Sequence, residues 1–565
     1  MKYVDAEAGV LCSARVIDRL VLLLVTAALA SCGGSGASYT VGGTVNSLST
    51  SGLVLADGAD AVAVPANTKS FTLPSPVAAG ASYTVTVKTQ PAGQTCQVQN
   101  GSGFVSSAIQ NITVRCTGPW VWKAGADTNG APAIYGVMGT ASAGNTPGAR
   151  TGSATWTDEA GNLWLFGGTY VAASGDFYDL NDLWKFSPSS GFWTWMGGSS
   201  TLPSPPLLGL PGVYGTQGIA ATANVPGSRA NAVTWTDRAG HLWLFGGLGN
   251  DSTKYTNYLN DLWKYDTGTG QWTWVDGPST ANPPVAFYGT QGVSAANDMP
   301  GPRQGASSWM DSSGNLWLFG GYGDISDSSP YRFGLLNDLW MFSPTVGGWT
   351  WVSGSNTLNA VGSYGVQGTA AAGNVPGARS GAVSWIDAQD NLWLFGGGTS
   401  LGFTNDLWKF TPSTNLWTWV SGSSTPGALG VYGTLGSAVV GGNDPAAPPN
   451  VPGARIAAAS WLDASGNFWL FGGAVEYTAQ TYGLFNDLWQ FSPATGLWTW
   501  MSGANTPPAA GVYGTLGIAS PANVPQARQS AVAWADGSGN LWLFGGEGNA
   551  EPLAGSALND LWEYL

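Results

Sequence analysis

Six arginines and six aspartates recur at fixed positions along the 565-residue chain, and these side chains have the types and spacing that could do chemistry. Arginines gathered around one axis could bind an anion, and a carboxylate beside them could act as an acid or a base. Equal numbers of opposite charge favour a structural role, because a buried charge is costly once its partner is removed. We therefore predict that each arginine pairs with an aspartate of its own or a neighbouring repeat. The arginines are Arg150, Arg229, Arg303, Arg379, Arg455 and Arg528, and the aspartates are Asp182, Asp261, Asp338, Asp406, Asp487 and Asp560.

Other reactive side chains are scarce. His241 is the only histidine, and it stands where other repeats carry an asparagine, as at Asn162 and Asn315. A further aspartate opens each of these turns, where its carboxylate caps its own backbone. One histidine and the few cysteines are too small a ligand set for a metal site. We predict no catalytic residue, no metal and no cofactor.

The N-terminus has the pattern of an export signal. Arg15 and Arg19 precede an apolar run over residues 21–30, which is too short to span a bilayer and is typical of a signal-peptide core. The run ends in Leu-Ala-Ser-Cys-Gly at residues 29–33, which resembles the lipobox of bacterial lipoproteins. The resemblance implies a signal peptide over 1–31, a lipidated Cys32, a short linker over 32–37, and an outer-membrane or cell-surface location. The alternative is an ordinary signal peptide with a chance cysteine.

Residues 38–117 form a separate unit. Short segments in which apolar and polar residues alternate are divided by Gly, Asn and Ser, as expected for strands. If Cys12 is removed with the signal peptide and Cys32 carries the lipid, two cysteines are left, Cys96 and Cys116. Two cysteines in an oxidising export compartment indicate one disulfide. The unit fits a small β-sandwich and resembles the immunoglobulin-like modules of secreted bacterial proteins. We expect it to be a spacer.

The charge balance limits the choice of partner. Only 9% of the residues are charged, with 19 basic against 33 acidic side chains. Six of the few basic residues after residue 118 are the repeated arginines. No basic stripe is left to track a phosphate backbone, so we predict no nucleic-acid partner.

All 30 tryptophans fall on five positions of a repeat that occurs six times. Each repeat predicts four strands, written here a to d, with "TWTD", "LWLFGG", "NDLWKF" and "WTWV" as their patterns. The sixth repeat lacks its last pair, and Trp120 and Trp122 stand alone before the first repeat. This displacement predicts a closed ring in which an N-terminal strand completes the final repeat.

These repeats resemble kelch repeats. The resemblance lies in the arginine of "PGAR", the diglycine that ends strand b, the "ND" before strand c and the tryptophan of strand d. It covers about 80% of the chain and implies an all-β, six-bladed kelch-type propeller over 118–565. The repeats, 73 to 79 residues apart, are longer than kelch units of about fifty. The excess lies in the connections from strand d to strand a. Galactose oxidase is a propeller of this type, but its copper site needs two histidines.

The connections suggest a binding face. The a–b and c–d turns are short and uniform, whereas the b–c connections hold 7 to 15 residues and the d–a connections are long. Recognition usually lies in variable loops on a rigid scaffold. We therefore predict that ligand contacts come from the b–c loops, at Phe177, Tyr178, Lys254, Tyr255, Tyr258, Tyr331, Arg332, Phe333, Phe403, Glu476, Tyr477 and Tyr482.

Together these features predict an exported, membrane-anchored lipoprotein whose propeller binds a protein or a glycan through its long-loop face. The alternatives are a carbohydrate-active propeller enzyme, of epimerase, sialidase or lyase type, and a purely structural envelope protein.

Overall fold

The computed structural model describes residues 37–565 except for short gaps, and every regular element in this part of the chain is a β-strand. The gaps are 47, 49, 92–93, 119, 173–175, 204–207, 282–285, 326–331, 434, 437, 439–448, 479–480, 508, 538 and 549–556. No helix long and apolar enough to cross a bilayer occurs among the described residues. The expected signal peptide and Cys32 lie outside them.

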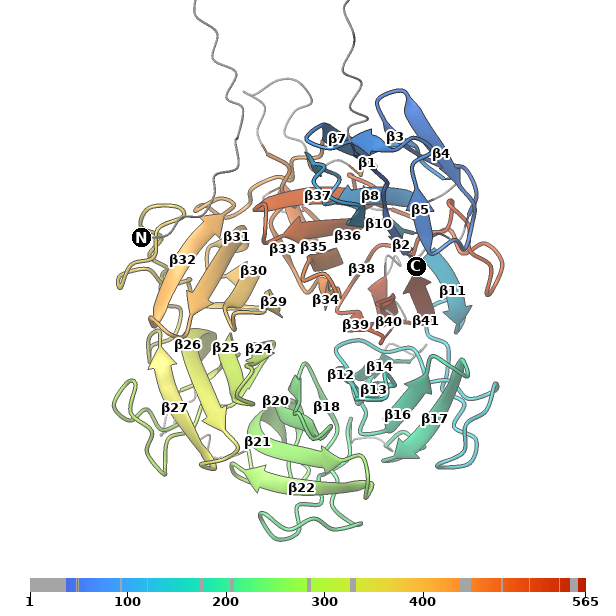
Figure 1. The fold of residues 1–565 in the computed structure, drawn as a ribbon. Helices are drawn as coiled ribbons and strands as arrows, with labels where there is room; N and C mark the ends of the chain where they lie inside the picture. The colour runs from blue at the N-terminus through green and yellow to red at the C-terminus, as the bar shows by residue number, and fades with distance from the viewer. Residues whose placement is uncertain are drawn as a thin grey trace, which may run out of the picture.

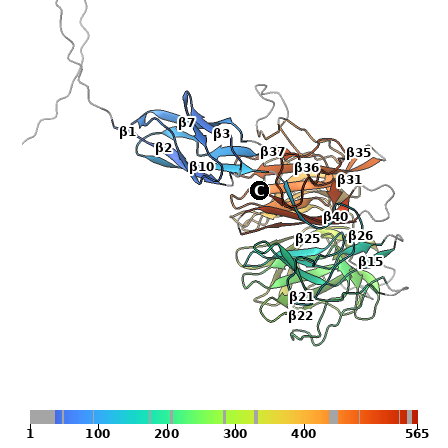
Figure 2. The same ribbon diagram turned by 90° about the vertical axis from the view of Figure 1, so that its right-hand side faces the viewer.

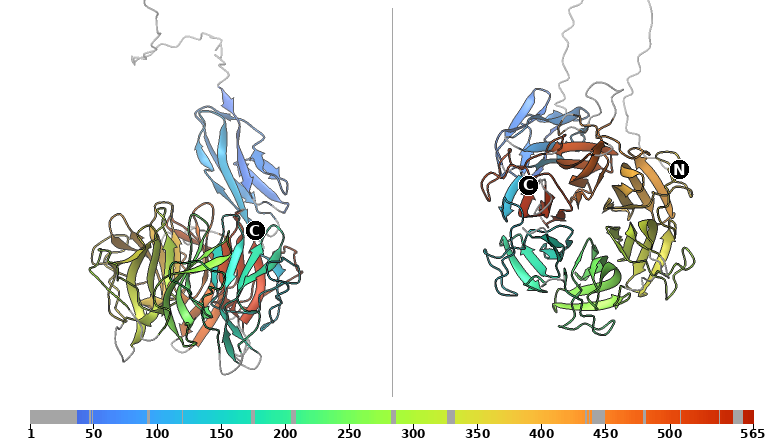
Figure 3. Two further views of the ribbon diagram at one scale, coloured as in Figure 1. Left: turned by 90° about the horizontal axis from the view of Figure 1, so that it is seen from below. Right: turned by 180° about the vertical axis from the view of Figure 1, so that it is seen from behind.

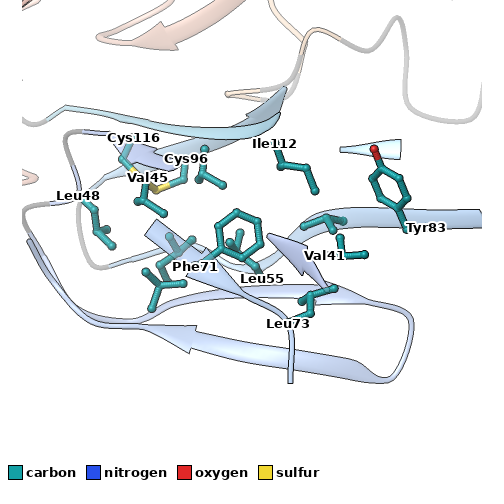
Figure 4. Packing of buried hydrophobic residues seen from close by; sticks show 14 of the residues in the cluster. Val41, Val45, Leu48, Leu55, Phe71, Leu73, Tyr83, Cys96, Ile112 and Cys116 are labelled. Atoms are coloured by element: carbon teal, nitrogen blue, oxygen red, sulfur yellow. A yellow bond between two sulfur atoms is a disulfide. The ribbon is translucent and has the colours of Figure 1, made fainter. Parts of the chain in front are cut away.

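Two four-stranded sheets and a small strand pair make up the N-terminal part. The sheets have the orders β5-β2-β10-β8 and β4-β3-β7-β9, and β1 pairs with β6. They enclose an apolar core that includes Val41, Leu55 and Ile112 (Figure 4). The predicted Cys96–Cys116 disulfide is confirmed, and it joins directly paired positions of β8 and β10. The strands are β1 (Ser38–Tyr39), β2 (Val41–Asn46), β3 (Leu53–Asp57), β4 (Asp60–Val64), β5 (Ser70–Thr72), β6 (Val77–Ala78), β7 (Ser82–Thr89), β8 (Thr95–Gln99), β9 (Ser102–Phe104) and β10 (Ile109–Thr117).

The rest of the described chain forms antiparallel sheets of four or five strands around a common axis, a propeller-like fold (Figure 1). We number the sheets 1 to 6 in chain order. Sheet 1 contains β12 (Ala154–Thr157), β13 (Leu163–Phe166), β16 (Leu183–Ser187) and β17 (Phe192–Gly197), beside a separate hairpin of β14 (Thr169–Val171) and β15 (Phe177–Asp179). Sheet 2 contains β18 (Arg229–Ala230), β19 (Val233–Thr236), β20 (Leu242–Asn250), β21 (Thr256–Asp266) and β22 (Gln271–Asp276).

Sheets 3 to 5 repeat the plan of sheet 2. Sheet 3 contains β23 (Arg303–Gln304), β24 (Ser307–Met310), β25 (Leu316–Asp324), β26 (Phe333–Ser343) and β27 (Gly348–Ser353). Sheet 4 contains β28 (Arg379–Ser380), β29 (Val383–Ile386), β30 (Leu392–Thr399), β31 (Gly402–Thr411) and β32 (Leu416–Ser421). Sheet 5 contains β33 (Arg455–Ile456), β34 (Ala459–Leu462), β35 (Phe468–Thr478), β36 (Thr481–Ser492) and β37 (Leu497–Ser502).

Sheet 6 joins the two ends of this region. It contains β38 (Arg528–Gln529), β39 (Val532–Ala535), β40 (Leu541–Gly548) and β41 (Ala557–Tyr564), and its outermost strand is β11 (Trp120–Ala124). Trp120 pairs with Tyr564 and Trp122 pairs with Trp562. The displaced tryptophan pair therefore completes the last sheet, which covers an edge that would otherwise be open to another chain.

The innermost strands form a closed circle of contacts. Each of β12, β19, β24, β29, β34 and β39 contacts the innermost strand of both neighbouring sheets. Just before each of these strands, one residue with positive φ donates its backbone N–H to the carbonyl of the corresponding residue in the preceding sheet, at 2.7–3.3 Å. We call these six residues the collar. They are Gly152, Asn231, Gly305, Gly381, Ala457 and Ser530.

The sequence led us to expect strand b to end at the diglycine. This is so in sheet 1, where β13 ends at Phe166, but in sheets 2 to 6 strand b continues past the diglycine. In sheet 2, β20 continues through Gly246 and Gly247 to Asn250, with a register shift between Phe245 and Gly247. Both glycines have positive φ. A β-bulge with left-handed residues therefore bends the strand without ending it. The predicted b–c loops of sheets 2 to 5 are largely strand hairpins as a result.

The described parts of the long d–a connections are hydrogen-bonded to the sheet that follows them. A glycine in each connection donates its N–H to the carbonyl of the second "WTW" tryptophan in the sheet that follows, as Gly218 does to Trp274 at 2.8 Å. The connection therefore covers the outer edge of that sheet, which would otherwise expose unpaired backbone groups. The other pairs are Gly139–Trp195, Gly292–Trp351, Gly368–Trp419, Gly436–Trp500 and Gly517–Trp122.

Tryptophans fill the spaces between sheets. The buried apolar clusters each straddle two neighbouring sheets, including the pair formed by sheets 6 and 1. The tryptophan of the innermost strand also donates its indole N–H to a backbone carbonyl of the next sheet. Such bonds join Trp156 to Trp243, Trp235 to Trp317, Trp309 to Trp393, Trp461 to Trp542 and Trp534 to Trp164.

Candidate functional site

Each repeated arginine forms a bidentate ion pair with the repeated aspartate of its own sheet. In sheet 2, Nη1 and Nη2 of Arg229 lie 2.7 and 2.8 Å from the two carboxylate oxygens of Asp261. Arg229 also donates from Nε to the carbonyl of Gly227 and from Nη1 to that of Gly246. Both side chains are almost completely buried. The other pairs are Arg150–Asp182, Arg303–Asp338, Arg379–Asp406, Arg455–Asp487 and Arg528–Asp560.

Each aspartate has two further donors that complete its hydrogen bonding. Asp261 accepts the indole N–H of Trp263 at 2.7 Å and the hydroxyl of Tyr214 at 2.7 Å. The tyrosine was missed as a partner by sequence reasoning, although the repeated "YG" of the d–a connection marks it. The remaining tyrosines are Tyr135, Tyr288, Tyr364, Tyr432 and Tyr513.

In the cluster of sheet 4, the electrostatics keep the ion pair charged and the tyrosine neutral. Burial alone would lower the pKa of Arg379, but the carboxylate of Asp406 raises it above its usual value. Burial would likewise raise the pKa of Asp406, and Arg379 lowers it. Burial, followed by the Asp406 charge, raises the pKa of Tyr364. The cluster of sheet 4 therefore neither exchanges protons near neutral pH nor has a free charge for an anion, and in the other five sheets the arginine charge is paired in the same way.

The aspartates of the a–b turns form hydrogen bonds within their own hairpins. Asp237 accepts the backbone N–H of His241 at 3.0 Å and the indole N–H of Trp243 at 2.8 Å. The Nδ1 atom of His241 lies 2.9 Å from the same carboxylate, where other repeats place an asparagine amide. Burial would raise the pKa of Asp237, but hydrogen bonds from Trp243 and His241 lower it. Among the described residues, no three His, Cys, Asp or Glu side chains gather as a metal-binding group.

The candidate ligand residues of sheets 2 and 3 come together in part. Tyr258 lies inside β21, and its ring centroid is 5.0 Å from Phe333 at the start of β26 and 5.7 Å from Tyr322. Tyr322 was missed because it lies next to the diglycine that we expected to end strand b. Lys254 and Tyr255 lie in the turn between β20 and β21 and are exposed.

The other candidates lie in or beside β15, β26, β31, β35 and β36, or outside the described residues. Phe177 and Tyr178 lie in β15, Phe403 lies in β31, and Arg332 directly precedes β26. Tyr331 falls outside the described residues. Glu476 and Tyr477 lie in β35 and Tyr482 lies in β36, and the positions of their side chains fall outside the described part. The structure therefore brings together the rings of Tyr258, Tyr322 and Phe333 from sheets 2 and 3.

Cavities in the described part of the ring include one on its axis and one in sheet 1. One lies on the axis, holds about 350 Å³, and is lined by β19, β24, β29 and β34. Its wall carries the hydroxyls of Thr234, Ser308, Ser384 and Ser460, and Met310, Ile386 and Leu462 lie toward the ends of their strands. The second lies in sheet 1, holds about 170 Å³, and is lined in part by Tyr135, Arg150 and Tyr170.

The site and the fold define an all-β, propeller-like protein whose repeated charges are internal. No family model matches the chain. A solved structure described as "Structure of YjhT" is similar over 74% of this chain and 95% of that one, with 15% sequence identity and a TM-score of 0.42. A similarity of this size carries no functional argument.

Proposed function

We propose that the protein is an exported, membrane-anchored lipoprotein in which a six-bladed kelch-type propeller binds a protein or a glycan through the face that carries the b–c hairpins. In this proposal Cys32 carries the lipid and residues 38–117 are a small β-sandwich that acts as a stalk. The observation that carries it is the position of the stalk on the opposite side of the propeller.

The stalk contacts the side that carries the short a–b turns. Arg115 of β10 donates from Nη1 to Ser465 Oγ at 2.9 Å and lies 3.4 Å from a carboxylate oxygen of Asp463, both in the a–b turn of sheet 5. The backbone N–H of Gly118 donates to the carbonyl of Leu565 at 2.6 Å. These contacts attach the stalk to the short-turn side at two points.

The chain enters the stalk at its far end. β1 lies at the tip away from the propeller, and β10 returns toward it (Figures 2 and 3). An anchor attached before β1 would hold the short-turn side toward the membrane and direct the hairpins outward. The hairpins also differ in length, since β20 and β21 are joined by residues 251–255 whereas β30 and β31 are joined by residues 400–401. Varied hairpins on a rigid scaffold are a typical recognition surface.

A hairpin exchange tests this proposal. The full-length protein would be screened against a glycan array and against immobilised envelope proteins, and the hits would be measured again with residues 251–255 replaced by the two-residue turn of sheet 4. We expect binding to fall by at least tenfold. The control exchanges the a–b turns at residues 237–241 and 387–391 and should leave binding unchanged. Loss of binding only in the control would show that the short-turn side is the binding face.

A further inference from the structure

Sheet 1 departs from the plan of the other five sheets at its repeated arginine. In sheets 2 to 6 the arginine pairs with a residue of strand b, as Arg229 does with Gly249. In sheet 1 the backbone pairing between the arginine segment and strand b stops one residue pair earlier, at the bridge between Thr151 and Thr169. β14 and β15 then form a separate hairpin. The missing strand pair therefore leaves an opening beside Arg150, whereas in sheets 2 to 6 the paired backbone covers the corresponding arginine.

The opening is the cavity of about 170 Å³. Tyr170 of β14 and Leu180, which follows β15, line it from the hairpin, and Ser200 and Leu202 line it from the segment after β17. Tyr178 lies opposite Tyr170 in the hairpin register and is two residues before Leu180, so the three side chains share one face. Leu202 is 44% exposed at the edge of the cavity. All of these residues lie on the hairpin side of the propeller.

The cavity offers no free charge. Arg150 donates from Nη1 and Nη2 to Asp182 and from Nε to the carbonyl of Gly148. The Tyr135 hydroxyl donates to the same aspartate at 2.9 Å. A charged group entering the cavity would lose water without gaining a partner, which is unfavourable. The occupant should therefore be uncharged.

Size decides between the remaining occupants. Sites for whole small-molecule ligands usually hold about 300–1,000 Å³. This cavity is smaller, and its exposed edge is apolar at Leu202, as in the pockets that receive one anchoring side chain at a protein interface. We propose that the cavity of sheet 1 receives a single uncharged, apolar side chain, of the size of leucine or phenylalanine, from a protein partner. This inference rests on the proposed function, and it identifies the partner of the hairpin side as a protein.

The test uses small probes and a variant that fills the cavity. N-acetyl-leucinamide, N-acetyl-phenylalaninamide and methyl glucoside would be titrated into the full-length protein and followed by saturation-transfer NMR. The filling variant is Ser200→Phe, because Ser200 is an exposed cavity residue whose substitution leaves the ion pair intact. The control is Ser424→Phe, at the equivalent exposed position of sheet 4, where Arg379 pairs with Thr399 and the ladder is complete.

We expect both amino-acid amides to bind with dissociation constants in the millimolar range and Ser200→Phe to weaken them at least tenfold, with Ser424→Phe unchanged. Binding of methyl glucoside alone, lost in Ser200→Phe, would overturn the protein partner in favour of a glycan. Amide binding that survives Ser200→Phe, or no binding by any probe, would overturn the cavity as a site. The hairpin exchange is a separate measurement. It can therefore support the proposed binding face even if the probes show that the cavity is not a binding site.

Discussion

The ring of Trp385 lies flat against the ring of Phe468, with 5.1 Å between the centroids and 5° between the planes. In the five other sheets the corresponding tryptophan donates its indole N–H to the next sheet. The Nε1 atom of Trp385 is buried without an acceptor. The difference follows from one residue, because Phe468 stands where the other repeats carry leucine. A stacked aromatic pair has replaced a hydrogen bond at this interface.

We predict that Phe468→Leu restores the missing bond from Trp385 to the carbonyl of Trp469. Loss of ring contacts is offset by a hydrogen bond worth about 0.5–1.5 kcal/mol, so the free energy of unfolding should change by less than ~1 kcal/mol. The measurement is urea unfolding together with hydrogen exchange of the indole N–H, which should slow. Phe410→Leu, a buried site without such compensation, should cost clearly more. An unchanged indole exchange rate would contradict the explanation.

Removing one partner of a buried ion pair should destabilise its sheet strongly. Arg379→Ala leaves the Asp406 carboxylate buried without its cation, and breaking such a pair typically costs about 3–5 kcal/mol. Tyr364→Phe removes one hydrogen bond to the same carboxylate and should cost about 1 kcal/mol. Chemical denaturation checks both values. A smaller loss in Arg379→Ala than in Tyr364→Phe would show that the carboxylate is neutral in the folded protein.

The hairpin of sheet 1 should make stability depend on pH. Burial raises the pKa of Asp179 to about 6, although a hydrogen bond from Thr169 lowers it. Because the folded pKa exceeds the unfolded one, the contribution is complete below about pH 4 and is lost as the pH rises through 6. Asp179→Asn should therefore stabilise the protein at pH 7, by up to about 3 kcal/mol, and have little effect at pH 4. Equal effects of the substitution at both pH values would contradict this assignment.

The collar contains residues that are strained by their conformation. Ala457 has a φ of 52° in the left-handed region, which costs an L-residue roughly 1–2 kcal/mol. Ala457→Gly should relieve this strain and raise the free energy of unfolding by about 0.5–1 kcal/mol. Gly381→Ala, at the matching position of sheet 4, should lower it, and Ala458→Gly should also lower it. Thermal unfolding distinguishes these signs, and destabilisation by Ala457→Gly would refute the account.

The lipid anchor is tested by a cysteine substitution. Cys32→Ser should abolish labelling with radioactive palmitate and release the protein from the membrane fraction. Cys12→Ser should do neither, since it lies in the predicted signal peptide. Labelling that persists in Cys32→Ser would place the lipid on another residue or remove the lipoprotein assignment.

The sequence predicted the repeated structure well because each repeat has the same pattern of strand and turn residues. The tryptophan positions and the unpaired Trp120 and Trp122 indicated how the sheets are built and where the last one is completed. The collar could not be predicted, since it is made of backbone groups from six distant segments whose side chains have no common type. The cavity of sheet 1 depends on strand pairing that stops one residue pair early, in a hairpin whose sequence follows no repeated motif. Tyr170 and Leu202 had no motif to mark them.

The pairing of Trp120 with Tyr564 also determines how late in synthesis the ring of sheets can close. During synthesis, β11 leaves the ribosome about 440 residues before its partner β41 exists. At about 5–20 residues per second, this delay amounts to roughly twenty seconds to a minute and a half. Throughout that interval the early strand has an unsatisfied edge and two large indoles without a binding partner. The ring therefore cannot close until the last strand of the chain has been made.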